Sequence, residues 1–174
     1  MPPCVTCGGT VAPDGHCWDC GAPQPAFRSH LERAAPGPAA VTDRARRTLN
    51  ADAMALAASG PWTIGVVCDG VSMSPRADRA AQVAAATAAT VLAARLPAGA
   101  DAGDPRPQTR SYRPRGPGHL LLCTDGLWRH LPDPAALRDR LNGTAPLDGA
   151  RSLVQHALDA GATDNTAALL IRLG

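Results

Sequence analysis

Two apolar runs of this chain end in the same way, on an aspartate followed by a glycine. The run WTIGVVC precedes Asp69-Gly70, and the run HLLLC precedes, after one threonine, Asp125-Gly126. Short apolar runs that are bounded by turn residues predict buried β-strands. A single Asp-Gly pair would indicate only an ordinary turn. Two strands with the same ending predict that carboxylates from separate strands converge at one end of a sheet.

Two further aspartates lie at the ends of predicted strands. Asp52 is the second residue of the run ADAMALA, and Asp164 stands two residues before the run TAALLIRL. Converging carboxylates repel one another and need cations, and ligand sets made only of oxygen suit Mg²⁺ or Mn²⁺. A glycine after Asp69 and after Asp125 leaves room for a metal ion, its waters or a backbone carbonyl. The four aspartates therefore predict a site for divalent metal ions.

The order of the predicted elements indicates the fold class. The pattern predicts strands over 51–57 and 62–68 joined as a hairpin, a helix over 74–96, a strand over 119–123, helices over 133–143 and 147–161, and a strand over 166–173. Such an order suits an α+β domain with an antiparallel or mixed sheet better than repeated βαβ units.

Four cysteines near the N-terminus form two Cys-x-x-Cys pairs: Cys4 with Cys7, and Cys17 with Cys20. Two such pairs match the tetrahedral thiolate shell of a structural Zn²⁺ ion, and the pattern resembles the zinc-ribbon knuckles of many bacterial proteins. Two disulfides or a redox pair are the alternatives; the lack of an export signal argues against the first and the duplication of the pair against the second. His16 is expected to be a turn residue, because four cysteines complete the shell.

Three segments are predicted along the chain. Residues 1–22 form the zinc-ribbon-like knuckles, and residues 23–40 form a Pro/Ala-rich linker with a helical turn around 29–35. Residues 41–174 form the folded domain, which residues 97–118 interrupt as a proline- and arginine-containing loop.

Composition excludes several classes of protein. No apolar run reaches the roughly 20 residues of a membrane span, and the N-terminus does not read as a signal peptide, so we expect a cytoplasmic protein. A net charge of +2 and an aromatic content of 3% give little support for a zinc-ribbon nucleic-acid binder. Every basic residue is arginine and the sole glutamate is Glu32, which excludes P-loop lysines, Schiff-base lysines and His-Glu-x-x-His metalloproteases. Acid chemistry must therefore rest on aspartate.

Four stretches of the chain carry a family resemblance. They are RTLNADAMAL (47–56), VVCDGVSMSP (66–75), LLLCTDGLWRHLP (120–132) and GATDNTAALLI (161–171). In this order they resemble the motifs of metal-dependent serine/threonine protein phosphatases of the protein phosphatase 2C (PPM) type, in the version of bacterial, actinobacterial members with a cysteine-rich N-terminus. The resemblance implies an α-β-β-α sandwich of mainly antiparallel sheets flanked by helices, here shortened and preceded by a small zinc ribbon.

The resemblance also implies a site with two Mn²⁺ or Mg²⁺ ions. Asp69 would bridge both ions, and Gly70 would offer its carbonyl to one of them. Asp125 and Asp164 would bind the second ion, and Asp52 would hold metal-bound water.

The implied activity is hydrolysis of phosphoserine and phosphothreonine by a metal-activated bridging water. Arg47 matches the arginine that grips the substrate phosphate, a role for which the fork of guanidinium donors is suited. The implied partner is a protein phosphorylated by a serine/threonine kinase.

The chain departs from the family pattern at two places. Ala51 stands where family members carry a further acidic or amide residue. Residues 97–118 replace the strands and helices of the family's middle, including a Gly-Asp-Ser-Arg-like turn that GDPR (103–106) only mimics. Lost strands leave unpaired sheet edges that allow self-association. The alternative is therefore a catalytically impaired phosphatase-like remnant that serves as an interaction or regulatory module.

Overall fold

The computed structural model describes residues 4, 6–12, 15–23, 29–71, 74, 76–95 and 112–174. Its elements are, in chain order, β1 (His30–Ala34), β2 (Pro38–Asp43), β3 (Ala53–Ser59), β4 (Trp62–Cys68), α1 (Ala77–Arg95), β5 (Gly118–Cys123), α2 (Asp125–Trp128), α3 (Pro134–Leu141), α4 (Pro146–Asp159) and β6 (Thr166–Leu173). The predicted helix start at Pro75 and most of the predicted loop at 97–118 lie outside the described residues.

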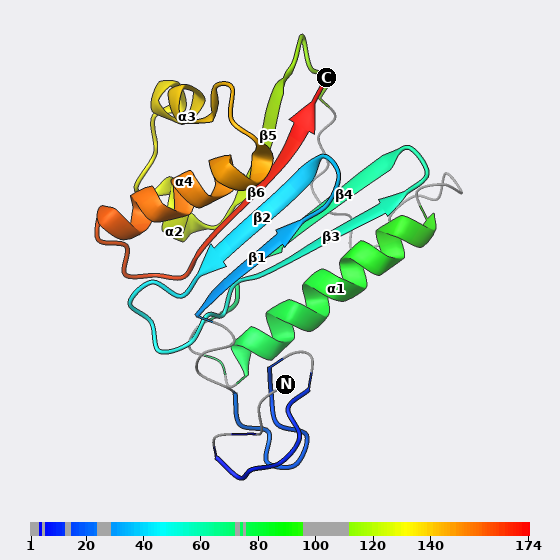
Figure 1. The fold of residues 1–174 in the computed structure, drawn as a ribbon, viewed down its shortest axis with the longest axis vertical. Helices are drawn as coiled ribbons and strands as arrows, with labels where there is room; N and C mark the ends of the chain where they lie inside the picture. Colours follow the sequence, from blue (N-terminus) through cyan, green and yellow to red (C-terminus); the bar gives the residue numbers. More distant parts are fainter. Residues whose placement is uncertain are drawn as a thin grey trace.

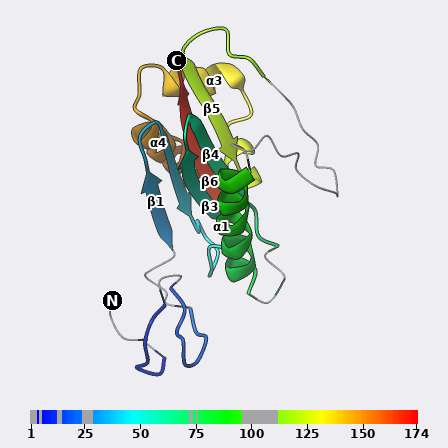
Figure 2. The same cartoon turned by 90° about the vertical axis from the view of Figure 1, so that its right-hand side faces the viewer.

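The elements are stacked in four layers (Figure 1). A four-stranded sheet has the strand order β1-β2-β6-β5, and a second sheet pairs β3 with β4; every pairing is antiparallel. Helix α1 covers β3 and β4, helix α4 covers β2 and β6, and the two sheets face each other through β4 and β6 and through β2 and β3 (Figure 2). The predicted α-β-β-α sandwich of antiparallel sheets is confirmed.

The two sides of the core bury apolar side chains of different size. The central strand β6 is buried from Thr166 to Leu170, and beneath α4 it packs with large side chains, among them Val41, Leu127 and Leu153. Beneath α1, by contrast, the buried cluster consists of alanines, with Val66 and other half-buried residues packed against it. A leucine contributes several buried methyl and methylene groups where an alanine contributes one, so the α1 side is held by less hydrophobic burial.

Most predicted elements are confirmed. The predicted hairpin is formed by β3 and β4, which pair from Ala53 opposite Cys68 to Ser59 opposite Trp62. The strands predicted over 62–68 and 166–173 coincide with β4 and β6. Asp133 caps α3, because its carboxylate accepts a hydrogen bond from the backbone N–H of Ala135 at 2.9 Å.

The prediction of a linker with a helical turn is wrong for residues 29–40. This segment holds β1 and the first half of β2, two strands of the larger sheet joined by a turn in which Gly37 has a φ of 98°. Of its small residues, Pro38, Ala39 and Ala40 are buried in β2. Small residues fit this strand because it lies between the facing sheet and α4.

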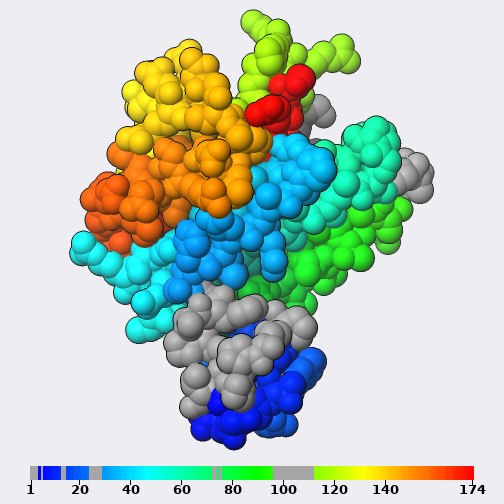
Figure 3. Space-filling model, viewed as in Figure 1, coloured from blue at the N-terminus to red at the C-terminus, as the bar shows by residue number. Residues whose placement is uncertain are grey.

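The described N-terminal residues, blue in Figure 3, lie at one end of the molecule. Across the described part of the chain, no helix combines the length and the apolar character needed to cross a membrane.

Candidate metal centre

Asp52 lies at the base of the candidate centre, directly before β3. Its side chain is 4% exposed, and its Oδ2 accepts a hydrogen bond of 2.8 Å from the hydroxyl of Thr124, the residue that follows β5. The same hydroxyl accepts a hydrogen bond of 2.9 Å from the backbone N–H of Ala167 in β6. Thr124 therefore ties Asp52 to the ends of two strands of the opposite sheet. Thr124 was not among the predicted site residues, although it stands directly before Asp125 in the sequence.

The four predicted aspartates come within electrostatic reach of one another. Burial raises the pKa of Asp52 to about 7, and the carboxylates of Asp69, Asp164 and Asp125 also raise it, against the hydrogen bond from Thr124. The pKa of Asp69 is raised by burial and then by Asp125 and Asp164. Four separate segments thus bring carboxylates to one end of the sandwich.

The aspartates are more widely spaced than the ligands of a closed metal site. Among the described residues, the four cysteines are the group of acidic, histidine or cysteine side chains whose ligand atoms all lie within 4.8 Å of one another. Two of the aspartates instead pair with arginine. Arg47 Nη2 lies 3.0 Å from Asp164 Oδ2, and Arg129 Nη2 lies 2.7 Å from Asp125 Oδ2.

Only one of these two arginines was a predicted site residue. Arg47, a predicted site residue, lies beside Asp164, and its side chain is 42% exposed, which leaves the guanidinium accessible. Arg129 was not predicted to take part. Its spacing of four residues from Asp125 is the usual spacing of an ion pair on a helix, and this spacing is the signal in the sequence that could have found it.

Each Asp-Gly pair requires its glycine because a backbone carbonyl occupies the space of a side chain. A Cβ atom on Gly70 would lie 2.3 Å from the carbonyl oxygen of Ala51, and one on Gly126 would lie 2.0 Å from that of Asn165. A backbone carbonyl, which was one of the groups expected next to these glycines, fills the space beside each of them. The glycines therefore fix how the aspartate turns dock against the neighbouring segments.

Asn165 is a scaffold residue that sequence reasoning missed. Its Oδ1 accepts a hydrogen bond of 2.8 Å from the backbone N–H of Ala51. Its Nδ2 donates to the carbonyl oxygens of Arg44 and Leu49 at 3.0 and 2.9 Å. This one buried amide holds the segment that carries Arg47 against the start of β6. The sequence offers only a weak signal, an Asp-Asn pair before a strand.

The four cysteines form a second candidate metal site. Their Sγ atoms lie within 4.8 Å of one another, with 3.7 Å between Cys4 and Cys20 and 3.4 Å between Cys7 and Cys17. Four thiolates at the Zn–S distance of 2.3 Å would be about 3.8 Å apart, so the donor set fits a tetrahedral ion such as Zn²⁺. Backbone N–H groups donate to the sulfurs of Cys4 and Cys17, which is the usual support of thiolate ligands.

The prediction that His16 is a turn residue is wrong. Its backbone forms a β-bridge with Pro23, and its side chain is buried against α1, where Nε2 lies 2.9 Å from Asp78 Oδ2.

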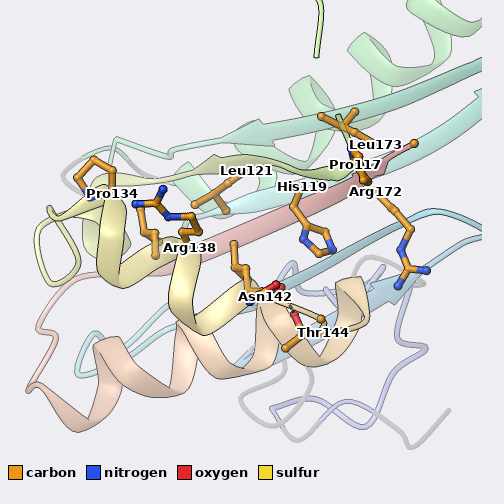
Figure 4. A pocket seen from close by; sticks show the side chains of 14 residues that line it. Pro117, His119, Leu121, Pro134, Arg138, Asn142, Thr144, Arg172 and Leu173 are labelled. Atoms are coloured by element: carbon orange, nitrogen blue, oxygen red, sulfur yellow. Dashed lines mark hydrogen bonds between the residues drawn. The ribbon is translucent and has the colours of Figure 1, made fainter. Parts of the chain in front are cut away.

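A groove of about 860 Å³ lies at the other end of β5 and β6 (Figure 4). His119, Arg138 and Arg172 are among its lining residues, with apolar residues such as Leu121. The aspartates follow the end of β5 and precede β6, whereas this groove lies where β5 starts and β6 ends. The groove is therefore not part of the candidate metal centre.

No protein-family model matches the sequence, and no curated protein matches it significantly. Two solved structures are similar in fold. One is a bacterial serine phosphatase that carries a point substitution, with 14% identity and a TM-score of 0.35 over 81% of this chain and 51% of that one. The other is PppA, a key regulatory component of the T6SS in Pseudomonas aeruginosa, with 22% identity and a TM-score of 0.32 over 78% of this chain and 52% of that one. This chain thus spans about half the length of both. Because both TM-scores lie below 0.5, the assignment of a function depends on the residues of this chain itself.

Proposed function

We propose that this protein is a metal-dependent phosphoprotein phosphatase that hydrolyses phosphoserine and phosphothreonine. The observation that carries the proposal is the gathering of four aspartates and Arg47, from four separate motifs, at one end of the sandwich. These motifs follow one another in the order of the PPM-type phosphatases.

The donor set fits divalent cations of the Mn²⁺ or Mg²⁺ type. It contains only oxygen atoms, and burial and then the neighbouring carboxylates raise the pKa of Asp52 and Asp69, which a bound cation would offset. By the family pattern, Asp69 and the Gly70 carbonyl would hold one ion, and Asp69 with Asp125 and Asp164 would hold the other. When bound, two such ions would supply a water activated for attack on phosphorus and would offset the charge of the phosphoryl oxygens.

Three further residues of the site would bind the substrate phosphate or hold the site in position. Arg47 presents a half-exposed guanidinium beside Asp164, and its two parallel donors match two oxygens of a phosphate group. Thr124 restrains the carboxylate of Asp52 through its hydrogen bond to Oδ2. Asn165 holds the segment of Arg47 in place.

The substrates we propose are proteins phosphorylated by a serine/threonine kinase. We further propose that the cysteine cluster holds a structural Zn²⁺ ion.

The test is phosphate release from a phosphoserine peptide with added Mn²⁺. The parent chain is compared with Asp69→Asn and with Asp148→Asn, a matched loss of one carboxylate on the exposed surface of α4. We expect release by the parent and by Asp148→Asn, and a loss of at least about a hundredfold in kcat/KM for Asp69→Asn. Circular dichroism first establishes that all three proteins are folded. A folded parent that releases no phosphate, or an Asp69→Asn variant as active as the parent, would disprove the proposal.

A second candidate function is a catalytically impaired interaction module. It is favoured by the sheet of β3 and β4, which has only two strands in the described residues and so leaves strand edges open, and by the engagement of Asp125 and Asp164 with arginines. This candidate predicts a folded protein that binds the phosphopeptide in fluorescence polarisation without hydrolysing it. Self-association through the open edges would appear as a concentration-dependent mass in analytical ultracentrifugation.

A further inference from the structure

A buried polar contact joins the cysteine module, which we define as residues 4–23, to the sandwich. His16 Nε2 lies 2.9 Å from Asp78 Oδ2, and these side chains are only 8% and 3% exposed. His16 directly precedes the cluster ligand Cys17, and Asp78 is the second residue of α1. Figures 1 and 2 both show the module at the start of this helix. A carboxylate is rarely buried without a specific partner, so this contact marks a defined docking point.

Helix α1 depends on such a docking point because its hydrophobic anchor is small. Its buried face repeats alanine at every fourth residue, from Ala77 through Ala81 and Ala85 to Ala89. Each alanine buries a single methyl group, whereas a leucine or valine would bury several carbon atoms. Packing alone therefore leaves the position of the first turn weakly determined.

The backbone that leads into α1 is strained. Arg76 has a φ of 60°, in the left-handed region that residues with a side chain rarely adopt, and it directly precedes the helix. Its carbonyl accepts a hydrogen bond of 3.0 Å from the N–H of Ala80, so the strained residue is tied to the first turn. Strain of this kind persists only where the surroundings hold the chain in place.

The same segment connects the helix to the Asp69-Gly70 turn. Gly70 is fixed at one end of the segment by its close approach to the Ala51 carbonyl. At the other end, the contact of Asp78 with His16 supplies a restraint from outside the sandwich.

We propose that the metal-loaded cysteine module is a clamp that positions the start of α1 and, through it, the Asp69-Gly70 turn. A metal ion on the four sulfurs fixes the backbone at Cys17 and therefore the adjoining His16. His16 is a positioning residue that transmits this order to Asp78. The effect on α1 is independent of the reaction, whereas its consequence for Asp69 rests on the proposed function.

Hydrogen exchange of the full chain tests the clamp. The protein is loaded with Zn²⁺, and the metal is then removed with a chelator and its loss confirmed by elemental analysis. We expect the amides of residues 80–84 in α1 to exchange at least about tenfold faster without Zn²⁺, as the loss of a buried charge-assisted hydrogen bond implies. Amides of α4 should not change. Equal exchange of residues 80–84 in both states would overturn the proposal.

Substitutions distinguish the effect of the His16–Asp78 contact on α1 from a general destabilisation caused by the loss of Zn²⁺. In Zn²⁺-loaded Asp78→Asn and His16→Phe, residues 80–84 should exchange as fast as in the metal-free parent, and chelation should add nothing. Asp148→Asn, which removes a carboxylate from the first turn of α4, should leave the response of α1 intact. Arg76→Gly, which relieves the strain, should reduce the response to chelation. If residues 80–84 of Zn²⁺-loaded Asp78→Asn exchange as slowly as those of the Zn²⁺-loaded parent, the clamp is overturned. This result is sufficient even if His16→Phe does not fold.

Calorimetric titration with Mn²⁺ then measures the consequence for the candidate centre. We expect weaker Mn²⁺ binding in Asp78→Asn than in the parent, at equal Zn²⁺ content. An inactive parent that still shows the exchange response would disprove the proposed function and leave the clamp standing. An active parent without the exchange response would disprove the clamp alone.

Discussion

Replacing Gly126 with alanine should destabilise the protein by about 3 kcal/mol, because the new methyl group has no space. Its Cβ would lie 2.0 Å from the Asn165 carbonyl oxygen, whereas ordinary contacts begin at 3.4 Å, so the two backbones must separate by more than 1 Å. Asn165 cannot withdraw freely, because its side chain is hydrogen-bonded to Ala51 and Leu49. Overpacking costs about 1–3 kcal/mol and each disrupted hydrogen bond about 1 kcal/mol, while the helix propensity of alanine returns at most about 1 kcal/mol.

Urea unfolding followed by far-ultraviolet circular dichroism measures this effect. With a slope of about 2 kcal/mol per molar urea, the midpoint should fall by about 1.5 M without a change of slope. Gly118→Ala is the matched control, since a Cβ on Gly118 meets no atom within 4 Å and its unfolding should stay within about 0.5 kcal/mol of the parent. A midpoint for Gly126→Ala that equals the midpoint of Gly118→Ala would refute the reasoning.

Two further substitutions test the scaffold. Thr124→Val should lower the unfolding free energy by about 2–4 kcal/mol, because the carboxylate of Asp52 and a buried N–H of β6 both lose a hydrogen-bond partner. Thermal unfolding measures this loss. The control is Thr90→Val, because the hydroxyl of Thr90 donates to an exposed helix carbonyl. Glu32→Gln should cost about 1 kcal/mol at pH 7, since Glu32 forms a two-point ion pair with Arg151. Hydrogen bonds from Arg151 lower the pKa of Glu32 from 4.5 to about 2, so its stabilisation is present above pH 4.5 and should disappear as the pH falls toward 2 in urea titrations.

The sequence predicted the elements that carry the aspartates because their signals are local. The run WTIGVVC matches β4 residue by residue, and TAALLIRL matches β6. An apolar strand that ends in a polar turn fixes where a carboxylate lies along its own strand. That these strand ends would meet followed from the fold class, which the structure confirms. The role of Asp69 and the other aspartates as metal ligands stays a prediction.

The residues that were missed depend on partners far away in the chain. Pro38 to Ala40 resemble a linker by composition, and their burial arises from pairing with β6 more than 120 residues later. Asn165 holds segments that begin more than 110 residues before it. His16 is buried because α1 lies against it, which no pattern around Cys17 could indicate. In each case a small or polar residue takes its role from a contact that local propensity does not record.

The scaffold of the candidate centre argues for a site under functional constraint. Burial, and then the neighbouring carboxylates, raise the pKa of Asp52 and Asp69, so their ionised forms oppose folding, and a sequence shaped by stability alone would separate these groups. This chain instead holds them together with two glycines that admit no side chain and with the buried polar groups of Thr124 and Asn165. Cations that bind the folded state would offset the repulsion and stabilise it by mass action. Because the alanine face of α1 supplies little burial beside this repulsion, the side of the sandwich that carries Asp69 should be the part whose stability depends most strongly on bound metal.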